Sequence, residues 1–320
     1  MDGFNEFEDE LKYDKYYCLN LKSYYHFPLA IKKLRKIIID NKVDLVHSSL
    51  YWSTVLARFA CPHNVPLVSS IQASLTDSVE YKKKWVGWLD RFSYNRRRST
   101  IIGVSQHTLD DYFNFLKLKK KNTYLLYNFV DTKKYTAVSN ELPKNNNDFR
   151  LITVGSLKIQ KNHRFLLEAF TKLKDQNISL DIYGDGLLKE MLAKFISDND
   201  LPVRLMGKVG NINEVIAGYD LFVMPSIYEG FSLAVLEGMV MEKPMLLSDT
   251  PTFVEQAADS AIYFSLNDVD DLVEKILLLK NDSGRLKEIA IKGRDRALQN
   301  FTLEHHMATL RKIYKDILSE

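Results

Sequence analysis

Two glutamates separated by seven residues mark the second half of the chain. Glu229 and Glu237 enclose the sequence GFSLAVL, and the apolar run DLFVMP (220–225) precedes them. A buried strand that ends in a carboxylate and a glycine, followed by a helix with a second carboxylate, puts hydrogen-bond acceptors beside free helix-start amides. Such a combination suits a ligand with both hydroxyl and phosphate groups.

Glycines and lysines follow the other predicted strands of this half in the same way. Ligands of open α/β sheets bind beyond the carboxyl ends of the strands. Glycine lets the backbone approach a ligand, and lysine neutralises phosphate. Each residue alone has an ordinary explanation as a turn or a solvated helix start. Their joint placement at successive strand ends is what favours a phosphate-binding site. They are Gly155, Ser156, Lys161, Asn162, Gly184, Asp185, Gly186, Gly207 and Lys208.

Short apolar runs alternate with helical periods throughout the chain, which predicts parallel sheets with crossover helices. The predicted strands are 43–49, 66–71, 100–105, 123–128, 150–155, 178–184, 202–207, 220–225, 244–249 and 261–265. The polar segment LPKNNND (142–148) is typical of a linker. We therefore expect an α/β fold of two Rossmann-like, doubly wound domains facing one another across a cleft. They would span 1–142 and 149–300, with a final helix within 301–320 that packs on either domain.

Length and composition indicate an ordinary globular protein of two domains. The chain has 320 residues, of which 46% are hydrophobic and 27% charged. Cys18 and Cys61 lie far apart, without the spacing of a disulfide framework or a zinc site. The acidic N-terminus is unlike a signal peptide, and no apolar run reaches the ~18 residues of a membrane span. We expect a cytoplasmic protein.

A basic, aromatic segment occupies residues 80–99. Trp85, Trp88, Leu89 and Phe92 fall at helical spacing among lysines and arginines. The favoured interpretation is a helix whose aromatic face enters the core. The alternative is a helix on the surface of a membrane, with its basic residues on anionic headgroups. No nucleic-acid-binding motif accompanies the charge, so a nucleic-acid partner is not expected.

Three segments together resemble the retaining nucleotide-sugar glycosyltransferases of family 4, which have the GT-B fold. EGFSLAVLE (229–237) is similar to the family's pair of glutamates seven residues apart. VGSLKIQKNHRFLLEAF (154–170) resembles its first C-terminal-domain strand and phosphate loop, and YNFVDTKKY (127–135) the segment that ends its N-terminal domain. The resemblance covers roughly residues 40 to 310 and is densest from 150 to 260.

The resemblance implies a role for each matched residue. Lys161 would stabilise the departing diphosphate, Glu229 would contact the transferred sugar near its reacting carbon, and Glu237 would bind the ribose. The amides of Gly230, Phe231, Ser232 and Leu233 would hold the diphosphate or the sugar. Gly155, Ser156 and Gly184 would line the donor site, and the backbone of Lys208 and Val209 would frame the base. Domain 1–142 would lie on the acceptor side and 149–300 would bind the donor, with no metal or other cofactor.

The chain also departs from the family pattern. The family's N-terminal strand and glycine-rich loop have no counterpart here, Gln72 stands where a sugar-contacting histidine is common, and Ser156 replaces an arginine. We expect transfer of a sugar to a saccharide or lipid-linked acceptor in surface-polysaccharide assembly. The alternative to a purely cytoplasmic location is a peripheral one at the inner face of the cell membrane. The alternatives are a noncatalytic nucleotide-sugar-binding or partner subunit and a sugar-nucleotide epimerase.

The histidines allow weaker expectations. His47 would line the cleft or pack in the core, and His163 would lie near the donor. His305 and His306, on the terminal helix, would be solvated.

Overall fold

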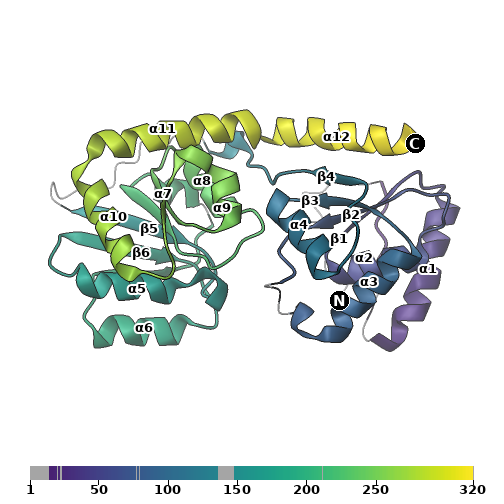
Figure 1. The fold of residues 1–320 in the computed structure, drawn as a ribbon, viewed down its shortest axis with the longest axis horizontal. Coiled ribbons are helices and arrows are strands. Elements are labelled where there is room, and N and C mark those ends of the chain that lie inside the picture. Colours follow the sequence, from purple (N-terminus) through teal and green to yellow (C-terminus); the bar gives the residue numbers. More distant parts are fainter. Residues whose placement is uncertain are drawn as a thin grey trace. The chain divides into compact units, whose positions relative to one another are not determined.

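The structure is a computed structural model that describes residues 14–19, 21, 24–76, 78, 80–135, 148–210 and 212–319. The chain divides into two compact units (Figure 1). The first comprises Met1–Gly103, Thr108–Leu125 and Lys312–Glu320, and the second comprises Val104–His107 and Leu126–Arg311. Of the linker expected at 142–148, all but the last residue lies outside the described residues.

The first unit contains a parallel sheet of four strands in the order β1-β2-β3-β4. The strands are β1 (Val46–Ser49), β2 (Leu67–Ile71), β3 (Thr100–Gly103) and β4 (Thr123–Leu125). The helices are α1 (Phe27–Asp40), α2 (Tyr51–Ala60), α3 (Lys84–Arg96) and α4 (Gln106–Phe115). Each of these strands falls within a predicted run.

The orientation of α3 differs from the favoured expectation. Trp85, Trp88 and Phe92 are exposed, and the opposite face, which includes Asp90, is buried. Asp90 accepts a hydrogen bond from the buried Arg58 guanidinium at 2.5 Å, and burial of this pair turns the polar side of the helix inward. The prediction that the aromatic stripe enters the core is therefore wrong.

The second unit contains a parallel sheet of six strands in the order β10-β9-β8-β5-β6-β7. The strands are β5 (Phe149–Val154), β6 (Ile178–Tyr183), β7 (Val203–Gly207), β8 (Leu221–Met224), β9 (Met245–Ser248) and β10 (Ile262–Phe264). The helices are α5 (His163–Lys172), α6 (Lys189–Asp198), α7 (Ile212–Ile216), α8 (Leu233–Val240), α9 (Pro251–Ala257), α10 (Val269–Asn281) and α11 (Ser283–Asn300). The expected α/β fold with two parallel sheets is confirmed.

The strand order of this sheet reverses next to β5. After β5 the chain adds β6 and β7 on one side, then crosses to β8 on the other side and continues outward to β10. The loops that leave β5 and β8 therefore diverge to opposite faces of the sheet. Ligands of doubly wound folds bind at such a switch point.

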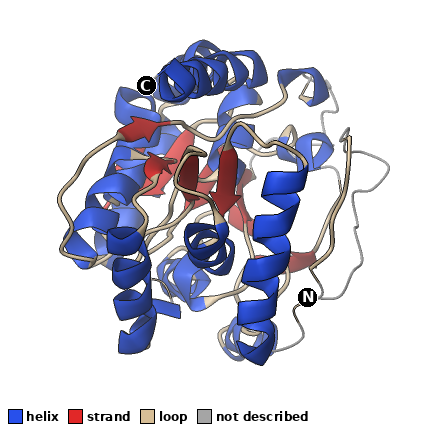
Figure 2. Cartoon of the chain, turned by 90° about the vertical axis from the view of Figure 1, so that its right-hand side faces the viewer, coloured by secondary structure: helices blue, strands red, loops and turns tan. Residues whose placement is uncertain are grey.

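The last helix, α12 (Leu303–Ser319), crosses the division between the units, and its end from Lys312 belongs to the first. The Tyr314 hydroxyl lies 2.5 Å from Nδ1 of His47, whose Nε2 lies 2.6 Å from Oγ of Ser70. His47 is thus a packed histidine whose pKa is lowered by burial. Figure 2 shows helices on both sides of the strands.

Candidate active site

An ion pair joins the two loops at the switch point of the second sheet. Lys161 Nζ donates to Glu229 Oε1 at 2.6 Å, and the Ser226 hydroxyl donates to the same oxygen at 2.7 Å. Only 14% of the Lys161 side chain and 9% of the Glu229 side chain are exposed. Two of the residues expected to carry the chemistry, one from each loop, are therefore in direct contact.

Gln160 fixes these loops to one another. Its carbonyl oxygen accepts from the amide of Ile227 at 2.9 Å, and its side-chain amide donates to the carbonyl of Tyr228 at 3.0 Å. The short 3-10 helix Ile159–Lys161 is thereby held against the segment that follows β8. Sequence reasoning did not single out Gln160, because both of its contacts are to the backbone of residues distant in sequence and leave no local pattern. Its side-chain hydrogen bond, for example, spans 68 residues.

The ends of β5 and β6 approach one another so closely that only glycine fits. Gly184 has φ +144°, and a Cβ atom built on it would lie 1.9 Å from the carbonyl oxygen of Gly155. A Cβ on Gly155 would lie 3.1 Å from the side chain of Lys161. Gly184 thus allows the two strand ends to pack against each other, and Gly155 packs directly against the lysine of the ion pair.

A pocket of about 290 Å³ opens beyond the carboxyl ends of β5, β6 and β7. Its walls contain Gly155, Ser156, Gly184, Lys208 and Val209, which were all expected at the donor site. The remaining walls come from Val154, Tyr183, Asp185 and Ile212.

Tyr183 forms part of a buried network behind the pocket. Its hydroxyl lies 3.1 Å from the hydroxyl of Tyr219, which donates to Asp181 at 2.5 Å. Arg204 makes two bonds of 2.7 Å to the same carboxylate. Burial, together with the hydrogen bond to Asp181, raises the pKa of Tyr219, so its hydroxyl stays protonated and keeps its hydrogen bond to that carboxylate.

The segment before α8 is held by side chains from elsewhere in the unit. The Ser232 amide donates to Oε1 of Gln256 at 3.0 Å, and Nε2 of Gln256 donates to the Ser232 carbonyl at 2.8 Å. Asn128 donates to the carbonyl of Phe231 at 3.1 Å. The Ser232 amide is therefore already paired, which leaves the amides of Gly230, Phe231 and Leu233 for the anion-binding role expected of this segment.

Glu237 lies half-buried on α8, where Tyr135 donates to its Oε1 at 2.7 Å. Burial raises the pKa of Glu237, and the hydrogen bond from Tyr135 opposes that rise. Tyr135 was not predicted as a site residue. Its position as the last residue of YNFVDTKKY was the only signal that could have identified it.

His163 begins α5 and is 1% exposed. Neither ring nitrogen has a hydrogen-bond partner among the residues that the structure describes. Burial and the charge of Lys161 lower its pKa to about 4, so the ring is neutral at pH 7.

Gln72, His305 and His306 have surroundings of their own. Gln72 belongs to the first unit, where it lines a different pocket of about 340 Å³ with Tyr51 and Trp52. His305 is exposed as expected, whereas His306 is not simply solvated: its Nδ1 lies 2.7 Å from the carbonyl oxygen of Tyr127. No cluster of three or more His, Cys, Asp or Glu side chains that could hold a metal ion occurs within the described ranges.

Family models account for nearly the whole chain. The model described as glycosyl transferases group 1 matches residues 135–296, about half of the chain, and the model for glycosyltransferase family 4 matches residues 3–134. The chain belongs to the group 1 glycosyl transferases. This glycosyl transferase thus carries the ion pair, the glycine contacts and the pocket within the matched segment.

Curated relatives of the glycosyl transferase extend over most of its length. An uncharacterized glycosyltransferase of Methanocaldococcus jannaschii is 26% identical over 89% of this chain and 79% of its own. The UDP-Gal:alpha-D-GlcNAc-diphosphoundecaprenol alpha-1,3-galactosyltransferase of Escherichia coli is 24% identical over 90% of this chain and 79% of its own.

Solved structures confirm the GT-B fold. Anabaena HepE in complex with UDP has a TM-score of 0.80 at 19% identity, covering 91% of this chain and 82% of HepE. Sucrose-phosphate synthase of Thermosynechococcus elongatus has a TM-score of 0.82 at 15% identity, and the match covers 95% of this chain and 81% of the synthase. No helix within the described part of the glycosyl transferase has the length and apolar character needed to cross a membrane.

Proposed function

We propose that this glycosyl transferase moves a sugar from a nucleoside-diphosphate sugar to a saccharide or lipid-linked acceptor, with retention of anomeric configuration. The observation that carries the proposal is the Lys161–Glu229 ion pair at the switch point of the second sheet. Lys161 packs on Gly155, and Gly155 also lines the pocket beyond the ends of β5, β6 and β7.

Lys161 supplies charge where the reaction needs it. When the bond between the sugar and the diphosphate breaks, negative charge grows on the departing phosphate oxygen, and a positioned ammonium group stabilises that charge. The Lys161 side chain lies against Gly155, where no Cβ atom separates it from the strand end. The diphosphate would lie here, with the amides of Gly230, Phe231 and Leu233 as additional donors.

Glu229 faces the sugar in this arrangement. Its Oε1 accepts from Lys161 and Ser226, which fixes the carboxylate while its second oxygen remains for a sugar hydroxyl. Retention of configuration follows from the resemblance to the retaining family. Metal independence follows from the chemistry proposed for Lys161 and the amides, which supply the positive charge that a divalent cation supplies in other phosphate sites.

The pocket beyond β5, β6 and β7 would take the nucleoside. The backbone of Lys208 and Val209 would contact the base, with Tyr183 as the fixed wall. Glu237 would accept hydrogen bonds from the ribose diol, alongside the Tyr135 hydroxyl that already orients it.

The names of the relatives suggest the acceptor. The Escherichia coli relative acts on a sugar attached to diphosphoundecaprenol, and another Escherichia coli relative, 25% identical over 88% of this chain, is named an O-antigen biosynthesis glycosyltransferase. A lipid-linked saccharide in cytoplasmic assembly of a surface polysaccharide is therefore the acceptor class that we propose.

A two-stage experiment tests this function. Thermal-shift measurements with UDP, GDP, ADP, CMP and their common sugars would identify the donor, because ligand at ~100 times its dissociation constant adds about 2.7 kcal/mol to stability. The identified donor is then incubated, with EDTA, with undecaprenyl-diphosphate-linked N-acetylhexosamines, and the anomeric coupling of the product is read by NMR. We expect transfer with the donor's configuration. Binding without transfer would favour a noncatalytic subunit, and conversion of the donor sugar without acceptor would favour an epimerase.

A further inference from the structure

The first unit carries an exposed aromatic face on α3. Trp85 is 49% exposed, Trp88 64% and Phe92 47%, and the rings of Trp88 and Phe92 stack 5.3 Å apart. Single exposed apolar side chains are common on protein surfaces, whereas clustered ones mark an interaction site. Because the buried Arg58–Asp90 pair fixes the opposite face inward, α3 cannot rotate to cover these rings.

The aromatic face continues into a groove across three neighbouring helices. The groove has a volume of about 410 Å³. Its lining consists of Phe27 and Ile31 on α1, Trp52 and Phe59 on α2, and Trp85 and Leu89 on α3. The Trp52 ring lies 6.0 Å from Phe27 and 5.9 Å from Trp85. The apolar surface is thus one connected patch, which we call the aromatic groove.

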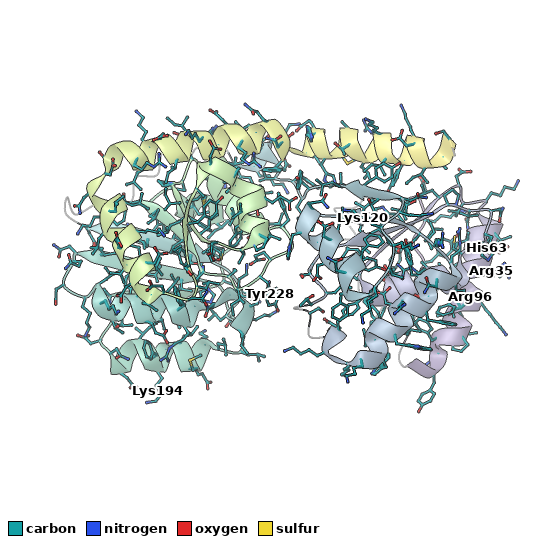
Figure 3. All side chains as sticks on the ribbon, viewed as in Figure 1. Arg35, His63, Arg96, Lys120, Lys194 and Tyr228 are labelled. Atoms are coloured by element: carbon teal, nitrogen blue, oxygen red, sulfur yellow. The ribbon has the colours of Figure 1, made fainter. Side chains whose placement is uncertain are left out.

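Exposed cations are numerous on two of the helices that form the aromatic groove and on the segments beside them. The exposed basic residues of α1, α3 and the segments that flank α3 are Lys32, Lys33, Arg35, Lys36, Lys82, Lys83, Lys84, Arg91, Arg96 and Arg98. The exposed acids of the same segments are Asp40 and Glu80. No ion pair joins these cations to an acid among the described residues. Arg35 and Arg96 lie toward the same end of the unit (Figure 3).

We propose that the aromatic groove binds the surface of a bilayer that contains anionic phospholipids. Tryptophan and phenylalanine insert at the boundary between headgroups and acyl chains, and lysine and arginine are attracted to the negative surface. The groove and the exposed cations of its helices supply both components. The sequence alone suggested one helix as a membrane contact, whereas the structure assigns this role to three.

Two other occupants fit less well. A second copy of the chain docked through the same face would bring one set of cations against another. A single-stranded nucleic acid needs open ring faces between phosphate contacts. Here Trp88 and Phe92 stack on one another, and the concave part of the patch is lined by aliphatic and aromatic side chains.

Intrinsic fluorescence reports on this surface directly, because the three tryptophans of the chain, Trp52, Trp85 and Trp88, all belong to it. The full chain is mixed with vesicles of phosphatidylcholine alone or with 30 mol% phosphatidylglycerol, roughly the anionic content that gives a strong surface potential. We expect a blue shift and co-sedimentation with the anionic vesicles, both reduced by salt.

Charge-reversed variants give the decisive comparison. Lys84→Glu/Arg91→Glu should weaken vesicle binding at least about tenfold, because each cation near an anionic surface contributes to the attraction. Lys189→Glu/Lys287→Glu makes the same change of net charge on exposed lysines of the second unit and should bind like wild type. The proposal would be overturned if both variants bound anionic vesicles equally, or if wild type bound neutral and anionic vesicles equally. It would also be overturned if the blue shift depended on protein concentration or on added oligonucleotide instead of lipid. Donor binding is measured separately without vesicles, so this result does not depend on the proposed function.

Discussion

Lys161 and Glu229 bring opposite charges into a largely buried position, which is costly for folding alone. Removing two charges from water is repaid only when the geometry is good and other hydrogen bonds complete it. The 2.6 Å contact and the Ser226 hydroxyl meet that condition. Buried pairs of this kind are weak evidence for stability, and their position at the switch point of the sheet makes these two residues candidates for function.

Glu229→Gln should separate turnover from nucleotide affinity. The amide keeps the size of the carboxylate but loses its charge beside the reacting sugar, so we expect kcat to fall about a hundredfold, as for loss of one electrostatic contact in a transition state. The Kd of the nucleoside diphosphate without sugar should stay within about threefold of wild type. Turnover near the wild-type rate would remove Glu229 from the mechanism.

Glu237 should make nucleotide binding dependent on pH. Its raised pKa means that protonation begins at a less acidic pH than for an ordinary glutamate, and the protonated group loses acceptor capacity for the ribose hydroxyls. Nucleotide affinity of wild type should therefore fall as the pH decreases through that pKa.

Glu237→Gln provides the comparison, because it cannot titrate. The ratio of the variant's Kd to that of wild type, measured by calorimetry from pH 8 to pH 5, should decrease toward one on acidification. A constant ratio would show that Glu237 does not contact the nucleotide as a carboxylate. Because the phosphates of the nucleotide titrate equally in both measurements, their effect cancels in the ratio of the two Kd values.

His163 should affect stability instead of affinity. Its pKa in the folded protein, about 4, is lower than the ordinary 6.5, so the unfolded chain binds a proton that the folded chain does not over this interval. The histidine thus destabilises the fold as the pH falls from 6.5 to 4. Relative to wild type, His163→Leu should gain about 2 to 3 kcal/mol of unfolding free energy between pH 7 and pH 4.5. Parallel stability curves, from urea titrations of both proteins, would contradict this account.

At the scale of elements, the register of β5 and β6 sets the distance between the strand ends. Val154 pairs with Tyr183, so Gly155 and Gly184 follow at the same level and touch through their backbones. Gly184→Ala should cost about 3 kcal/mol, because the added Cβ would overlap the Gly155 carbonyl oxygen and alanine rarely adopts φ +144°.

Gly210→Ala is the matched control for that substitution. A Cβ at Gly210 meets no atom within 4 Å and requires no positive φ, so thermal unfolding of this variant should resemble wild type. A Gly184→Ala protein as stable as Gly210→Ala would mean that the two strand ends are not packed as described.

The sequence predicted the strands and their ends because periodicity and glycine placement are local signals. Lys161, Gly155 and Gly184 could be assigned to one edge of a sheet in this way. Gln160, Tyr135 and Gln256 could not, since each acts through contacts with residues distant in sequence. The outward face of α3 was missed for a related reason: which side of an amphipathic helix is buried depended on Arg58, whose partnership with Asp90 no pattern indicated.

For the whole molecule, two parallel sheets could be predicted from the alternation of strands and helices, whereas contacts between segments distant in sequence could not. Among the described residues, 126–135 already belong to the second unit, and those from Lys312 belong to the first. Val130 illustrates the cause, because its amide donates to the carbonyl of Phe301 at 2.9 Å. A contact between residues so far apart in sequence is invisible to composition and periodicity.

Calorimetric titration of nucleoside diphosphates into wild type, Lys161→Met and Lys161→Met/Glu229→Gln tests the central claim most directly. The double variant removes the buried charge that the single substitution leaves unpaired, so loss of folding is distinguished from loss of a phosphate contact. We predict that one diphosphate binds wild type and that both variants bind it at least about tenfold more weakly, as expected for loss of a charge-assisted contact. Equal affinity in wild type and the folded double variant would contradict the assignment of the switch point as the diphosphate site.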